Sequence, residues 1–97
     1  MDIDTQTRCL GIIGNPLQHS LSPLLHNRTL RHLGLNYVYL PFEIDAEQVK
    51  EAVDSIRVLG ITGVNVTIPF KEAVIPYLDE LSPESRACAA VNVIVNQ

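Results

Sequence analysis

The sequence has no run of basic residues, no paired cysteines and no apolar segment long enough to cross a bilayer. The chain has seven Lys and Arg against eleven Asp and Glu, for a formal net charge of −4. No basic surface is therefore expected that could bind along the phosphates of a nucleic acid. A membrane-spanning helix needs about 20 apolar residues, and no stretch approaches that length. We therefore expect neither a nucleic acid nor a membrane as a partner.

Cysteine is also scarce, since Cys9 and Cys88 are the only two and they form no C-x-x-C pair. The first residues, Met1 to Asp4, lack the basic start and apolar centre of a signal peptide. Two separated thiols without an export signal are typical of a reducing compartment. These features predict a cytoplasmic protein.

The composition is that of a small globular domain. Of the 97 residues, 46% are hydrophobic and 19% charged, which does not fit a disordered chain. A folded chain of this size should expose roughly 5,500 Å² and bury roughly two-thirds of its surface. We expect one domain over residues 1–97.

Apolar strand-like runs alternate with helix-like segments along the chain. The strands are expected at 9–13, 37–44, 63–68 and 91–95. The helices are expected from Ser22-Pro23 to Gly34, over 45–59, after Pro69 and from Ser82-Pro83. This alternation predicts an α/β fold, a three-layer sandwich in which helices cover both faces of a mostly parallel sheet. Pro41 indicates that the second strand lies at an edge or carries a bulge.

Polar residues interrupt two of these strands. Side chains alternate along a strand, so Asn65 and Thr67 share one face, while Val64, Val66 and Ile68 share the other. Asn92 is a further amide within an apolar run. Open α/β sheets bind ligands beyond the carboxyl ends of their strands, which makes these residues candidates for ligand binding. The structural alternative is a set of satisfied polar groups in the core.

Lys71 follows directly on the strand that carries Asn65 and Thr67. At the start of a helix its charge would oppose the helix dipole, at a cost of roughly 0.3–1 kcal/mol. Beside amide and hydroxyl groups, a lysine can bind a ligand oxygen or exchange a proton. The alternative is a solvated surface lysine.

Ser20 and Ser22 flank Leu21 just before the expected helix. Two hydroxyls two residues apart in extended backbone face the same way, and beside free helix amides they would suit a carboxylate. The alternative is that Ser22 only caps the helix and Ser20 fills a loop.

Metal and phosphate sites are not indicated. The spacing of His19, His26 and His32 does not suit a metal site on one helix. The segment Gly11 to Gly14 matches neither the dinucleotide nor the P-loop fingerprint. We expect no metal and no cofactor bound by this chain.

Three stretches together resemble the N-terminal, substrate-binding domain of shikimate dehydrogenases. They are GNPLQHSLSPLLHN (14–27), GVNVTIPFK (63–71) and AVN (90–92). The resemblance implies an N-terminal domain of the amino-acid-dehydrogenase type. It also implies an enzyme of aromatic amino-acid biosynthesis that reduces 3-dehydroshikimate to shikimate with NADPH.

The resemblance also implies a role for each candidate residue. Ser20 and Ser22 would hold the shikimate carboxylate, and Asn65, Thr67 and Asn92 would bind the ring hydroxyls. Lys71 would be the catalytic lysine, stabilising the charge on the reacting oxygen and helping to deliver its proton.

Two features depart from the family pattern. Ala89 and Val93 stand where the family usually has Gly and Thr. The acidic partner of the lysine and the NADP-binding domain are absent from this chain, so we expect the fragment alone to be inactive. In the family the next strand pairs with 91–95, and its absence predicts self-association through that exposed edge. An NAD-dependent quinate/shikimate dehydrogenase and a non-catalytic hydroxy-acid-binding module remain alternatives.

Overall fold

The computed structural model describes residues 2–97, and its strands form a single four-stranded sheet. The strands are β1 (Arg8–Gly14), β2 (Tyr37–Glu43), β3 (Gly63–Val66) and β4 (Val93–Val95). Their order is β2-β1-β3-β4, with β4 antiparallel to β3 and the other neighbours parallel. This confirms the predicted α/β fold with a mostly parallel sheet, and β2 lies at an edge, as Pro41 indicated.

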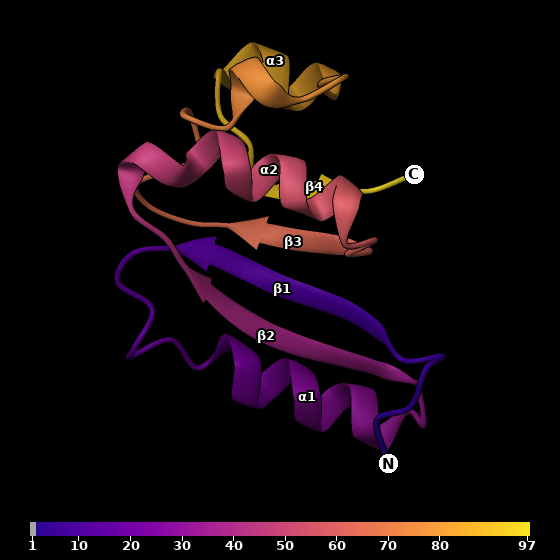
Figure 1. Cartoon of the computed structure of the whole chain (residues 1–97). Helices are drawn as coiled ribbons and strands as arrows, with labels where there is room; N and C mark the ends of the chain where they lie inside the picture. Colours follow the sequence, from indigo (N-terminus) through magenta and orange to yellow (C-terminus); the bar gives the residue numbers. More distant parts are fainter. Residues whose placement is uncertain (1) are drawn as a thin grey trace.

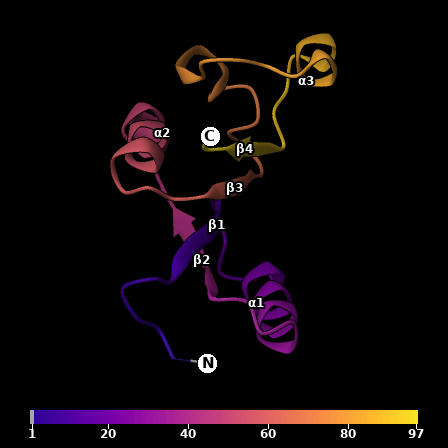
Figure 2. The ribbon, with the colours of Figure 1, turned by 90° about the vertical axis from the view of Figure 1, so that its right-hand side faces the viewer.

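Helices cover both faces of this sheet. The α-helices are α1 (Ser22–His32), α2 (Val49–Val58) and α3 (Pro83–Cys88), and the 3-10 helices are η1 (Ala46–Gln48) and η2 (Ile75–Tyr77). Figure 2 shows α1 and α2 on opposite sides of the sheet, which confirms the three layers. Within residues 2–97, no helix has the length and hydropathy needed to cross a membrane.

The core is divided between the two faces of the sheet. On one face, the apolar stripe of α2 (Val49, Val53 and Ile56) is buried against β3 and β4. The opposite face has a smaller cluster of Ile12, Leu17 and Tyr39, against which Leu30 of α1 packs. The other leucines of this helix and its ends remain exposed. The total exposed surface, 6712 Å², therefore exceeds the roughly 5,500 Å² expected for a compact chain of this mass.

The segment after β3 departs from the predicted elements. We expected the strand to continue to Ile68, but β3 ends at Val66 because the chain turns there, with Phe70 N–H donating to the Thr67 carbonyl at 3.0 Å. Ile68 is consequently 70% exposed instead of sharing the buried face of Val64 and Val66.

The helix expected after Pro69 is also wrong. Residues 69–74 form turns anchored by the buried side chains of Phe70 and Val74, and only η2 follows. Pro76 has no backbone N–H to continue a helix. Lys71 therefore lies in a turn, and the helix-dipole argument for it does not apply.

The backbone conformation at Ala89 explains why glycine is the usual residue at this position. It terminates α3 with a left-handed backbone, at φ 54° and ψ 38°. Glycine adopts this conformation without the clash of a Cβ, so the usual glycine is favoured there. The alanine costs roughly 1–2 kcal/mol.

Candidate functional site

The polar residues that interrupt the strands gather along the end of the sheet at which β1, β2 and β3 finish. This line of strand ends is the sheet edge that carries the candidate site, and it is distinct from the lateral edges formed by β2 and β4. The arrowheads of β1, β2 and β3 point to the same edge in Figure 1, where the antiparallel β4 begins. Thr67 N–H donates to the Ile13 carbonyl at 2.9 Å, and Val66 N–H donates to the Asn92 carbonyl at 2.7 Å. We had expected Asn92 within the last strand, but it directly precedes β4. These backbone bonds bring Asn65, Thr67 and Asn92 to the same edge.

Lys71 is tied to this edge through its backbone. Its carbonyl accepts a hydrogen bond from Val91 N–H at 2.8 Å, which places Lys71 beside the residue preceding Asn92. The side chain is half-buried. The ion pairs found within residues 2–97 involve Lys50 and Arg57 but not Lys71. Its ammonium group is thus available to a ligand oxygen.

The two serines lie at the start of α1 in a different geometry from the predicted one. Leu21 occupies the N-cap position with helical backbone angles (φ −89°, ψ −4°), so the segment is not extended and Ser22 is not the cap. Instead, the Ser20 hydroxyl accepts a hydrogen bond from Ser22 N–H at 3.2 Å. Because a hydroxyl that accepts a bond can still donate one, Ser20 keeps its proton for an anion.

The loop that carries Ser20 is anchored to the end of β2. The Leu17 N–H donates to the Glu43 carboxylate at 2.7 Å, and Asn15 Nδ2 donates to the Ile44 carbonyl at 2.8 Å. Leu17 itself is buried in the smaller core cluster. Sequence reasoning assigned no role to Glu43, whose carboxylate positions the loop from outside it.

Gly14, at the end of β1, permits a close approach that a side chain would prevent. A Cβ at this position would lie 2.3 Å from Thr67 Cγ2 and 2.9 Å from Leu17 Cδ2. The glycine therefore lets Thr67 pack directly against β1.

Tyr39 is a site residue that sequence reasoning missed. It is only 3% exposed, and its hydroxyl donates to Asn65 Oδ1 at 2.8 Å. Burial raises the pKa of the Tyr39 phenol, while a side-chain hydrogen bond with Ser22 opposes this rise. The phenol thus stays protonated at neutral pH. The available signal was a tyrosine inside a strand, whose hydroxyl needs a partner when buried.

Asn27 holds Tyr39 and α1 together. Its Nδ2 donates to the Tyr39 carbonyl and its Oδ1 accepts from the Tyr39 N–H, both at 2.8 Å. These two bonds occupy the outer edge of β2 and fix the helix that begins at Ser22.

Together the edge offers hydroxyls, amides and one ammonium group, which are the kinds of group that can hydrogen-bond a small hydroxylated anion. No group of three or more His, Cys, Asp or Glu side chains between residues 2 and 97 is arranged to hold a metal ion. The chemistry that these side chains themselves can supply is hydrogen bonding and proton transfer.

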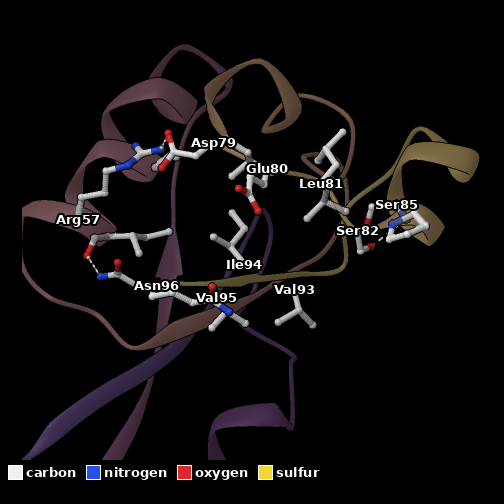
Figure 3. A pocket seen from close by; sticks show the side chains of 16 residues that line it. Arg57, Asp79, Glu80, Leu81, Ser82, Ser85, Val93, Ile94, Val95 and Asn96 are labelled. Atoms are coloured by element: carbon white, nitrogen blue, oxygen red, sulfur yellow. Dashed lines mark hydrogen bonds and ion pairs between the residues drawn. The ribbon is translucent and has the colours of Figure 1, made fainter.

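A separate hollow lies away from these residues. It has a volume of about 670 Å³ between α2, β4 and the segment 78–83, and none of the six predicted site residues lines it. Figure 3 shows Ile94 facing this hollow and Arg57 paired with Asp79 at its rim. The Asn96 amide is also engaged, donating to the Ile56 and Ile61 carbonyls. With these polar groups paired, the hollow is an incompletely covered part of the core.

The comparisons with known proteins agree on one family. The family model described as shikimate dehydrogenase substrate binding domain matches residues 12–94. A shikimate dehydrogenase (NADP(+)) of Syntrophomonas wolfei is 56% identical over 97 residues, which are the whole of this chain and 33% of that protein. The chain thus spans about a third of the length of the curated relatives it matches.

Solved structures agree with the sequence comparison. Shikimate 5-dehydrogenase from Listeria monocytogenes, in complex with shikimate and NAD, superposes with a TM-score of 0.95 at 41% identity, over 100% of this chain and 34% of that one. The enzyme from Thermus thermophilus, in complex with shikimate, gives a TM-score of 0.89 at 34% identity, over 94% of this chain and 35% of that one.

Proposed function

This chain belongs to the shikimate dehydrogenase substrate-binding domain family, and we propose that it forms the shikimate-binding part of an NADP-dependent enzyme that reduces 3-dehydroshikimate to shikimate. The observation that supports the proposal is the set of backbone hydrogen bonds that brings residues 65–67, Lys71 and Asn92 to neighbouring positions at one sheet edge. It agrees with the shikimate that the Listeria and Thermus relatives bind.

Each part of the edge suits one part of the substrate. The hydroxyls of Ser20 and Ser22 bind the carboxylate beside the N-terminus of α1, where the helix dipole favours negative charge. The Asn65, Thr67 and Asn92 side chains bind the ring hydroxyls.

Lys71 acts on the reacting oxygen. Its ammonium group stabilises the negative charge that develops there during reduction, and it supplies the proton that completes the alcohol. The lack of an ion-pair partner within residues 2–97 leaves this group free for that role.

The two glycines of β1, Gly11 and Gly14, do not fit the phosphate loop of a dinucleotide site. The two glycines of β1 face packed neighbours, since a Cβ on Gly11 would meet Phe42 and the Leu40 carbonyl, and one on Gly14 would meet Thr67. Within residues 2–97, these contacts leave no open cradle for a pyrophosphate at the end of β1. The NADP would therefore be held by another part of the enzyme, and the chain alone is expected to be inactive.

Binding of shikimate to this chain tests the proposal. We expect millimolar affinity by NMR titration, because part of the cleft is contributed from outside this domain. Benzoate, which has a ring carboxylate without hydroxyls, is the matched control and should bind at least several-fold more weakly. Equal responses to shikimate and benzoate would remove the ring hydroxyls from recognition.

We further propose that this chain self-associates through β4. Its outer edge has no strand partner in the described sheet, and Val93 and Val95 are 52% and 61% exposed. The opposite edge strand, β2, contains Pro41, which has no backbone N–H to donate and so discourages pairing. Sedimentation should show association that rises with concentration and falls in a Val93→Lys variant. A strict monomer at high concentration would contradict this proposal.

A further inference from the structure

Tyr39 is held rigidly between α1 and the Asn65 side chain of β3. Its backbone N–H and carbonyl are both bound by the Asn27 side chain, and its ring stacks on His26 with centroids 4.4 Å apart. The ring is buried beside Ile12 and Leu17. The hydroxyl that reaches Asn65 therefore has little freedom to move.

The hydrogen bond from the Tyr39 hydroxyl occupies the oxygen of the Asn65 amide and leaves its NH₂ group unused. An amide has one oxygen acceptor and two N–H donors, and Oδ1 already accepts from Tyr39 at 2.8 Å. The Nδ2 group is not among the hydrogen bonds found within residues 2–97. Since that part of the chain has no buried side-chain nitrogen or oxygen without a partner, the NH₂ group reaches the solvent.

We propose that Tyr39 is a positioning residue that orients the Asn65 amide, so that its NH₂ group donates to an oxygen of the bound substrate. This inference rests on the proposed function and deepens it. It assigns Asn65 the role of a donor, so that Asn65 recognises a lone pair on a ring oxygen and not its proton. The phenol is assigned no bond to the substrate in this account. It acts through the Asn65 amide, to which it donates its proton, and the Ser22 hydroxyl is its other polar neighbour.

A double-mutant cycle with shikimate separates this role from a general loosening of the fold. Tyr39→Phe removes the hydroxyl and should weaken shikimate binding by roughly 3- to 10-fold, the effect of one neutral hydrogen bond. In an Asn65→Ala background, the same change should have a clearly smaller effect, because no amide is left to orient and only the contact with Ser22 can still be lost. A purely structural role would weaken binding by the same factor in both backgrounds.

Two further variants complete the test. Asn65→Asp keeps an acceptor for the phenol but has no donor, so it should weaken shikimate binding at least as much as Asn65→Ala. Tyr37→Phe, on the same strand, is the matched control and should bind like the unmodified chain. If the unmodified chain binds shikimate and Tyr39→Phe binds it equally well, the inference is overturned alone. If the unmodified chain does not bind shikimate, the proposed function is overturned and the inference with it.

Discussion

Replacing Lys71 with methionine should lower kcat for shikimate oxidation by roughly 10²- to 10⁴-fold, the usual contribution of a proton-transferring group. Methionine approximates the length of the lysine stem but has neither a charge nor a proton. The expected loss lies in kcat, because the ammonium group acts mainly on charge that develops as the reaction proceeds.

The measurement needs a complete enzyme. A chimera in which this chain replaces the matching third of the Syntrophomonas wolfei relative supplies one, given their 56% identity over the whole chain. Lys50→Met is the control, since Lys50 is the other lysine and is paired with Asp54 at 2.8 Å on α2. It should leave kcat within about twofold. Near-normal turnover by Lys71→Met would remove Lys71 from the chemistry.

Gly14→Ala should damage both the fold and the site. The new Cβ would lie 2.3 Å from Thr67 Cγ2, a distance that forces the threonine away from β1. Overpacking of this kind costs roughly 1–3 kcal/mol. The free energy of unfolding measured in urea should therefore fall by about that amount. Displacement of Thr67 should also weaken shikimate binding by roughly tenfold or more.

A second-site change tests the cause of this loss. Thr67→Ser removes the clashing methyl group while keeping the hydroxyl, so Gly14→Ala with Thr67→Ser should recover part of both the stability and the affinity. If the double variant is no better than Gly14→Ala alone, then contact with Thr67 is not the reason for the glycine.

The fold was predictable where local signals agreed. Pro41 indicated the edge position of β2, Gly34 and Gly60 ended their helices with φ of 68° and 65°, and Ser82 caps α3 at 3.1 Å from Ser85 N–H. The segment after β3 was not predictable in the same way. Its course depends on burial of Phe70 and Val74, a tertiary effect that helix propensity does not include.

The sequence indicated which residues are candidates for the site but not how they are arranged. Alternation along the strands indicated Asn65 and Thr67, and the topology places Asn92 beside them. The serines were expected in extended backbone, whereas Leu21 is helical and Ser20 accepts the Ser22 N–H. Tyr39 was missed because its link to Asn65 joins positions 26 residues apart, which no local pattern encodes.

The most direct test of the account is to map where shikimate binds on this chain. Backbone amide shifts in an NMR titration would be followed at the sheet edge around Ser22, Asn65, Lys71 and Asn92, and in the hollow around Ser85 and Ile94. We predict saturable shifts at the sheet edge and none in the hollow. Shifts confined to the hollow, or none at the edge with millimolar shikimate, would contradict the assignment of this edge as the substrate site.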